Sequence, residues 1–290
     1  MFERRAYLLD MTRRVPTMRT LQELVDILAR YRYNEFRPFV EKNFPAELDL
    51  GKLGAYCEMQ GIEMVRTTRD EFEELFIRAE YVFVSTEAER SLAGRVEDMR
   101  ERMIRAEAQG RERKARGFLV TDFADECCWQ PLCVSLPGII MGGNFASGGA
   151  KSSMMDLEKE LDRVLEAPLG GLLLRLGTLY LRGGAPHDRV SELFNILSHD
   201  VGYSRHPGLT QFVLDDVSGV AHGVRLAAER WTERSDWAKE IVYAANLLDC
   251  ACHRRDEARL REVRDEHGHV WRLRFLPDGR VESLAKLPRF

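Results

Sequence analysis

Short apolar runs alternate with helical periodicity over the first half of the chain. Strands are predicted at the apolar runs 6–10, 35–40, 62–67, 80–85 and 118–123. Apolar residues spaced by three and four positions predict helices at 17–32, 48–61 and 92–117. Strands that alternate with helices in this way are typical of parallel βα units. The pattern therefore predicts an α/β domain over residues 1–150.

The pattern changes after the Gly- and Ser-rich stretch 142–153, which we interpret as a loop and linker. Only helical spacing follows, and helices are predicted at 156–166, 168–182, 188–199, 219–234 and 236–255. The tail alternates polar and apolar residues around "EHGH" and "PDG", which predicts a small antiparallel β meander. We thus expect a helical subdomain over 151–258 and a β tail over 259–290.

Charge and cysteine content narrow the classes of protein. The chain has 43 basic and 47 acidic residues and a formal net charge of −4, so no nucleic-acid partner is expected. No apolar run reaches the roughly 18 residues of a membrane span, and the N-terminus does not resemble a signal peptide. The six cysteines lack the spacing of a disulfide framework. We interpret the protein as cytoplasmic, with free thiols.

Two segments resemble a known family. The stretch "RRAYLLDMTRRVPTMRTLQELVDILARYRYNEF" (4–36) resembles the first strand, helix and second strand of the catalytic barrel of glycoside hydrolase family 20, the β-N-acetylhexosaminidases and their bacterial relatives. The stretch "GFLVTDFADECCWQPLCVSLPGIIMGGNFA" (117–146) is similar to the last barrel strand of those relatives. The resemblance is weak across the helical region and absent from the tail. It implies a (β/α) barrel and activity on a sugar.

The chain is too short between two of its strands to complete that barrel. About a dozen residues separate 62–67, which resembles the third strand, from 80–85, which resembles the seventh, whereas one βα unit needs roughly 30. Strands four to six, and with them the family's catalytic Asp-Glu pair, are missing. Because a barrel is a closed ring, the remaining strands are expected in the order seven, eight, one, two, three. This predicts a partial barrel with an open five-stranded parallel sheet.

An open sheet of this kind has two free edges and an inner face that lacks the opposite wall of the barrel. Such surfaces promote aggregation unless something covers them. We therefore expect a homodimer, or a protein partner that covers the open sheet. No metal ion or cofactor is expected, because no Cys-x-x-Cys pair occurs. A redox or metal protein built on the cysteines is a third and separate hypothesis.

Candidate site residues lie where parallel strands end, since ligands of βα folds bind there. The candidates for catalysis are Asp122, Asp125 and Glu126. The candidates for substrate binding are Arg5, Asp10, Arg13, Glu41 and Trp129. Arg5 is included because it resembles the first-strand arginine that grips sugar hydroxyls in family 20.

The same residues also have ordinary structural interpretations. Asp125 and Glu126 are adjacent, so in extended chain they point to opposite sides, and either could cap a helix or pair with an arginine. Trp129 could stack on a sugar or belong to the core. The Trp-Gly and Gly-His of the relatives are replaced by Phe123-Ala124 and Cys127-Cys128. We expect a catalytically degenerate binding or assembly protein, and the alternative is an active glycosidase on N-acetylhexosaminides or other small sugars.

Overall fold

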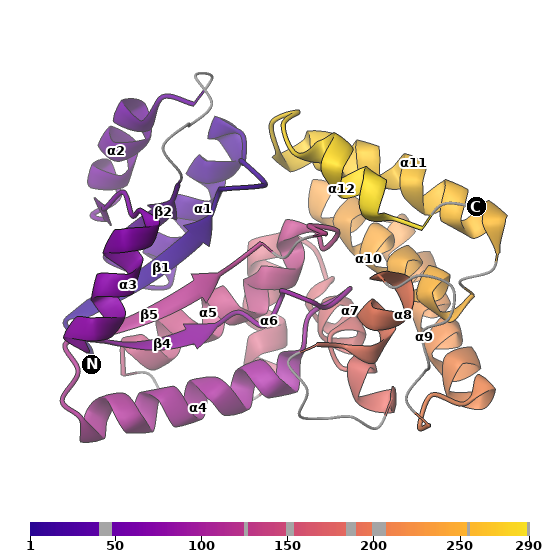
Figure 1. Ribbon diagram of the computed structural model, residues 1–290, viewed down its shortest axis with the longest axis horizontal. Helices are drawn as coiled ribbons and strands as arrows, with labels where there is room; N and C mark the ends of the chain where they lie inside the picture. Colours follow the sequence, from indigo (N-terminus) through magenta and orange to yellow (C-terminus); the bar gives the residue numbers. More distant parts are fainter. Residues whose placement is uncertain are drawn as a thin grey trace.

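A five-stranded parallel sheet forms the N-terminal half of the molecule (Figure 1). The computed structural model describes residues 1–40, 48–124, 127–148, 154–183, 190–198, 207–253 and 256–288. The strands are β1 (Arg4–Asp10), β2 (Glu35–Phe39), β3 (Glu63–Met64), β4 (Tyr81–Ser85) and β5 (Gly117–Asp122). Their order is β3-β2-β1-β5-β4, and every neighbouring pair is parallel. The predicted open α/β sheet and its strand order are both confirmed.

Four helices cover one face of the sheet, which we call the outer face. They are α1 (Met18–Arg30), α2 (Leu50–Met59), α4 (Val96–Glu112) and α5 (Leu136–Ala146). Helix α5 packs so closely that a Cβ atom at Gly142 would lie 2.3 Å from the side chain of Val120 on β5. The interpretation of 142–153 as a loop is therefore wrong for residues 142–146. Their glycines permit close helix packing, and residues 149–153 lie outside the described part.

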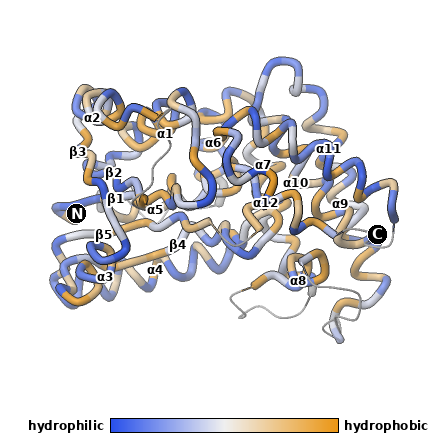
Figure 2. Tube along the Cα trace, turned by 45° about the horizontal axis from the view of Figure 1, so that its top comes forward, coloured by the Kyte–Doolittle hydropathy of each residue, from blue (hydrophilic) through white to orange (hydrophobic). Residues whose placement is uncertain are grey.

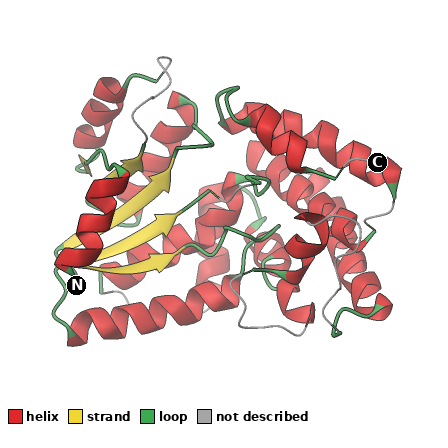
Figure 3. Cartoon of the chain, in the orientation of Figure 1, coloured by secondary structure: helices red, strands yellow, loops and turns green. Residues whose placement is uncertain are grey.

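Helix α3 (Arg69–Arg78) crosses the opposite, inner face of the sheet (Figures 1 and 3). It connects β3 to β4, which lie at opposite edges, so the chain travels in the reverse direction to β1→β2→β3. A right-handed crossover in the reverse direction places its helix on the other face. A capping box between Thr68 and Glu71 begins this helix. The sequence pattern had not suggested a helix here.

Aromatic contacts hold α3 on the inner face. The ring of Phe72 lies 5.8 Å from Phe39, 5.9 Å from Phe83 and 5.4 Å from Phe123, measured between centroids. Phe76 stacks on Phe83 at 4.0 Å. Each of these rings buries apolar area and adds a favourable edge or stacking contact. The expectation that the inner face lacks cover is wrong under α3, because the short segment between β3 and β4 folds as this helix and covers it.

The C-terminal half is helical, in agreement with the sequence pattern up to residue 253. It contains α6 (Met154–Leu165), α7 (Gly170–Leu176), α8 (Glu192–Ser198), α9 (Gln211–Glu229), α10 (Asp236–Cys252), α11 (Glu257–Arg274) and α12 (Arg280–Lys286). Two short 3-10 helices, η1 (Leu132–Ser135) and η2 (Leu179–Gly183), complete the elements. Along each helix, hydrophobic and hydrophilic residues alternate (Figure 2). This is expected when one side of a helix is buried.

The predicted β meander at 259–290 is wrong. Asp256 caps α11 by accepting from the backbone N–H groups of Ala258 and Arg259, and the helix continues to Arg274. The buried positions of α11 are spaced by one, three or four residues but include a histidine and an arginine. Because of these polar residues, the buried face of the helix resembles the alternation of polar and apolar residues that is typical of a strand. In the described part of the tail, extended pairing is limited to the single bridge between Pro16 and Phe275.

The two halves share one apolar core, which runs from Phe2 to Leu287. The proposed boundaries at 150 and 258 stay a prediction. Within the described residues no single helix is long and apolar enough to span a membrane. The bent pair Asp156–Leu165 and Gly170–Arg182 meets the criteria of length and composition only when the two helices are taken together.

Candidate functional site

Asp122, at the carboxyl end of β5, is buried and fully engaged. Its carboxylate accepts a hydrogen bond of 2.7 Å from the Tyr7 hydroxyl and one of 3.2 Å from the Thr86 hydroxyl. Asp122 is the register partner of Leu9, so its side chain points to the opposite face from that of the next residue, Asp10. The structure therefore does not bring these two carboxylates into one pocket.

Asp10 ends β1 on the inner face. One carboxylate oxygen accepts from the backbone N–H and the hydroxyl of Thr12, at 2.9 and 2.6 Å, and the other accepts from the N–H of Ala124 at 3.3 Å. Burial raises the pKa of Asp10, and these three hydrogen bonds oppose the shift. The residue organises the turns that follow β1 and β5.

Trp129 belongs to the core. It is 1% exposed, its indole N–H donates to the carbonyl of Ser283 at 3.1 Å, and its ring lies 5.6 Å from that of Phe194. The Ser283 hydroxyl in turn donates to the carbonyl of Cys127. The stretch that follows β5 is thus an anchor for α8 and α12, and the suggested stacking of Trp129 on a sugar is wrong.

Of the remaining predicted site residues, the structure describes Arg5 and Arg13, and neither bonds to Asp10. Arg5 lies at the start of β1, about 16 Å of strand away, and donates to the carbonyls of Arg32 and Phe2. Arg13 is exposed, and its carbonyl lies 2.1 Å from where a Cβ at Gly279 would be, which requires a glycine there. Glu41, Asp125 and Glu126 lie outside the described residues.

A buried ion pair joins the helical half to the carboxyl edge of the sheet. Arg274 on α11 pairs with Glu240 on α10 and with Glu23 on α1, and it lies 3.6 Å from the ring centre of Trp237. The second carboxylate oxygen of Glu240 accepts from the N–H of Cys133 at 2.8 Å. Glu240 has no exposed surface, so loss of Arg274 would leave a buried charge without its cation.

A chain of hydrogen bonds passes through His267, which lies on the same helix as Arg274. The Ser283 hydroxyl already donates to Cys127, so it must accept from Nε2–H of His267, at 3.0 Å. Nδ1 of His267 therefore accepts from the Tyr243 hydroxyl, at 2.7 Å. This arrangement requires a neutral imidazole. Burial, helped by nearby arginines, lowers the pKa of His267 to about 4.

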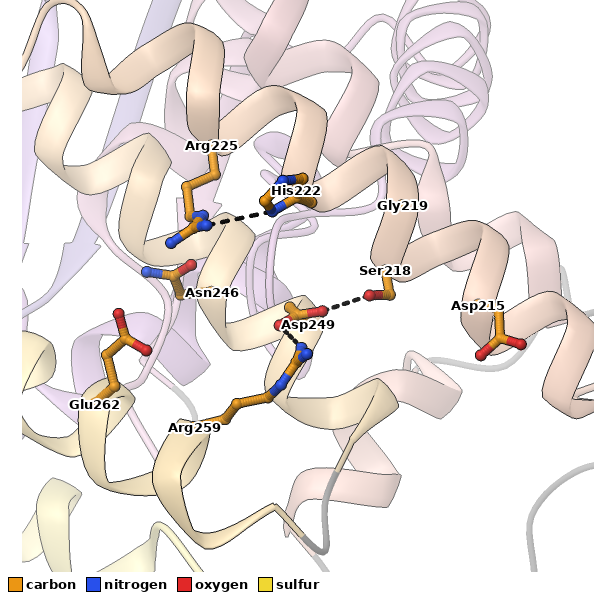
Figure 4. Close-up of a pocket in the computed structure, with 9 residues that line it drawn as sticks. All are labelled: Asp215, Ser218, Gly219, His222, Arg225, Asn246, Asp249, Arg259 and Glu262. Carbon is orange, nitrogen blue, oxygen red and sulfur yellow. Dashed lines mark hydrogen bonds and ion pairs between the residues drawn. The ribbon is translucent and has the colours of Figure 1, made fainter.

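A pocket of about 500 Å³ opens on the helical half, between α9, α10 and α11 (Figure 4). This volume lies within the range of sites for small molecules. Its lining residues are Asp215, Ser218, Gly219, His222, Arg225, Asn246, Asp249, Arg259 and Glu262. The sequence analysis named none of them. Polar residues recur every three or four positions along α9, but the contributions of α10 and α11 depend on tertiary packing.

Asp249 is the most heavily bonded group in this pocket. It accepts from the Ser218 hydroxyl at 2.5 Å, it pairs with Arg259, and His253 lies 3.3 Å away. Serine, histidine and aspartate are the residue types of a nucleophilic relay. Here, however, serine donates to the aspartate, whereas a relay needs histidine to take its proton. The arrangement does not activate Ser218.

Two glycines, Gly219 and Gly223, lie on the side of α9 that forms the pocket wall, and they leave open space there. A Cβ atom at Gly219 or at Gly223 would have no heavy atom within 4 Å. Neither glycine has a positive φ, so the fold itself does not require them. Glycine inside a helix costs about 1 kcal/mol relative to alanine.

Among the residues that the structure describes, neither the carboxyl edge of the sheet nor the pocket offers a metal site. All six cysteines are buried and lie outside any disulfide, and no three His, Cys, Asp or Glu side chains among the described residues are grouped to hold an ion. Burial raises the pKa of Cys250 to about 12, which makes it a poor nucleophile.

The chain matches no protein-family model, and no curated protein is significantly similar to it.

Proposed function

We propose that the chain is a catalytically degenerate relative of the family 20 glycoside hydrolase barrel that works as a binding or assembly protein. The observation that supports this most strongly is the state of the carboxyl edge of the sheet. Asp10 and Asp122 face opposite sides and are bonded internally, and Trp129 is buried. A glycosidase needs an acid and a base or nucleophile about 5–9.5 Å apart in one open site. Where the substrate's own acetamide attacks instead, it needs an acid and a carboxylate that orients the acetamide.

The proposal includes a homodimer formed through the remaining open part of the inner wall. On α3, Phe76 is 53% exposed and Ile77 is 81% exposed. They lie next to β4, which is an edge of the sheet. An isologous pair would cover the same patch on both copies, as a two-fold interface requires. The six buried free thiols support a cytoplasmic location within the same proposal.

Light scattering tests the assembly. We expect the purified chain to have the mass of a dimer, and Phe76→Ser with Ile77→Ser to reduce it to a monomer. Met59→Ser is the matched control, because Met59 is 79% exposed but lies on α2, on the outer face. A monomeric wild-type protein at micromolar concentration would contradict the assembly proposal.

An activity assay tests the loss of catalysis. We expect no hydrolysis of a chromogenic N-acetylglucosaminide above a buffer control. Hydrolysis that disappears in Asp125→Asn or Glu126→Gln would instead establish the alternative, an active glycosidase.

A further inference from the structure

We propose that the pocket between α9, α10 and α11 binds a small zwitterion, a ligand with a carboxylate and an ammonium group on the same carbon atom, such as a free amino acid. The proposal concerns a different surface from the barrel remnant and does not rest on the proposed function.

Hydrogen-bond accounting shows which lining groups have capacity left. Arg259 is occupied by Asp249, by Asp256 at 3.1 Å and by His253 at 3.0 Å. Arg225, in contrast, makes a contact of 3.2 Å to His222 and an ion pair of 3.7 Å to Glu229. A guanidinium has five N–H donors, so Arg225 retains several.

His222 helps to position the Arg225 side chain. A guanidinium can only donate, so Nδ1 of His222 accepts a hydrogen bond from Arg225. The remaining N–H groups of the Arg225 guanidinium suit a carboxylate, which accepts two parallel hydrogen bonds in a fork.

The acceptors come from α10 and α11. The amide nitrogen of Asn246 donates to both oxygens of Glu266, at 2.9 and 2.8 Å, which identifies the other amide atom as a carbonyl oxygen available to a ligand. Glu262 makes no hydrogen bond or ion pair within the described part of the chain. Arg225, Asn246 and Glu262 gather at one end of the pocket (Figure 4). An ammonium group next to a carboxylate would meet Asn246 and Glu262 while its carboxylate meets Arg225.

The charges of the pocket argue against other ligand classes. A phosphate would face the carboxylates of Asp215, Asp249 and Glu262, and a diamine would face two guanidinium groups. A neutral sugar would find no aromatic side chain among the lining residues to stack on.

Calorimetric titration with three matched probes tests the proposal on the full chain. L-Glutamine carries both charges, L-glutaminamide carries only the ammonium group, and N-acetyl-L-glutamine carries only the carboxylate. We expect glutamine to bind at least tenfold more tightly than either derivative. Equal binding of all three, tighter binding of one derivative, of inorganic phosphate or of N-acetylglucosamine, or no binding of glutamine at 10 mM would overturn the proposal.

Variants assign the site. Glu262→Gln and Arg225→Gln should each weaken glutamine binding at least tenfold. Gly219→Leu should abolish it by filling the pocket, without lowering the melting temperature, since space is open there. Gly268→Leu is the matched control: it is also a helical glycine, its Cβ would lie 3.7 Å from Arg272, and it lies outside the pocket. Unchanged glutamine binding in Gly219→Leu would overturn the site, and circular dichroism confirms that each variant is folded.

Discussion

Two polar regions of the molecule both contain carboxylates but differ in how far their hydrogen bonds are satisfied. At the carboxyl edge of the sheet, Asp10 and Asp122 are buried and accept two or three hydrogen bonds each. In the pocket on α9 to α11, Arg225 and Glu262 are partly or fully exposed and keep unused capacity. Among the described residues, the carboxylates at the sheet edge use their hydrogen-bond capacity inside the protein, whereas the pocket keeps donors and acceptors that a ligand could use.

The largest effect on stability is expected from the buried ion pair between Arg274 and Glu240. Arg274→Ala should lower the free energy of unfolding by about 3–5 kcal/mol, because it leaves Glu240 buried without its partner. Arg272→Ala, at an exposed position two residues earlier in α11, should change it by no more than about 0.5 kcal/mol. Urea denaturation measures the free energy of unfolding of both variants. Equal effects would show that the ion pair of Arg274 and Glu240 adds no specific electrostatic stabilisation.

Acid should act on the satisfied region through His267. Its folded pKa of about 4 lies below the unfolded value of 6.5, so the unfolded chain gains a proton first as pH falls. The resulting stability is fully present above pH 6.5 and is lost as the pH falls toward 4, by about 3 kcal/mol in total. In His267→Gln this contribution to the pH dependence should vanish, whereas in His269→Gln, at an exposed position, it should persist. Denaturant titrations at pH 7.5, 6, 5 and 4 measure the difference.

Two tyrosines allow a direct comparison of a buried and an exposed hydrogen bond to an aspartate. Tyr7 donates to Asp122 at 2.7 Å in the core, and Tyr56 donates to Asp26 at 2.8 Å on the surface. Tyr7→Phe should cost about 1.5–3 kcal/mol, since a buried carboxylate loses a donor, and Tyr56→Phe less than about 1 kcal/mol. The free energy of unfolding of each variant tests this. Similar values for the two would contradict the view that Asp122 depends on internal donors.

The smallest effect has opposite signs in helices α9 and α5. Gly223→Ala should stabilise the fold by about 0.5–1 kcal/mol, because a Cβ there meets open space. Gly143→Ala should destabilise it, because the new Cβ would lie 2.4 Å from the Tyr31 carbonyl oxygen. Melting temperatures give both signs. Destabilisation by Gly223→Ala would mean that α9 is packed more tightly than the structure shows.

The strand order could be predicted because it follows from the closure of a ring, which needs only short apolar runs and a resemblance. Helix α3 was missed although Thr68 and Glu71 form a capping box and Phe72, Leu75 and Phe76 have helical spacing. The tail was misjudged because its buried face includes polar residues that pair only with distant partners, as Arg274 does with Glu23. The pocket depends on three helices meeting, which no local pattern encodes.

The pairing of β1 with β5 has a consequence for how the chain is made. One edge of β1 pairs with residues that follow it by more than a hundred positions, since Arg4 is opposite Gly117. A ribosome needs roughly 5–20 s to synthesise that interval. Until then the central strand exposes an unpaired backbone edge. Contacts of such high sequence separation also slow folding. During synthesis the β1 edge is therefore open to wrong pairing until β5 has been made.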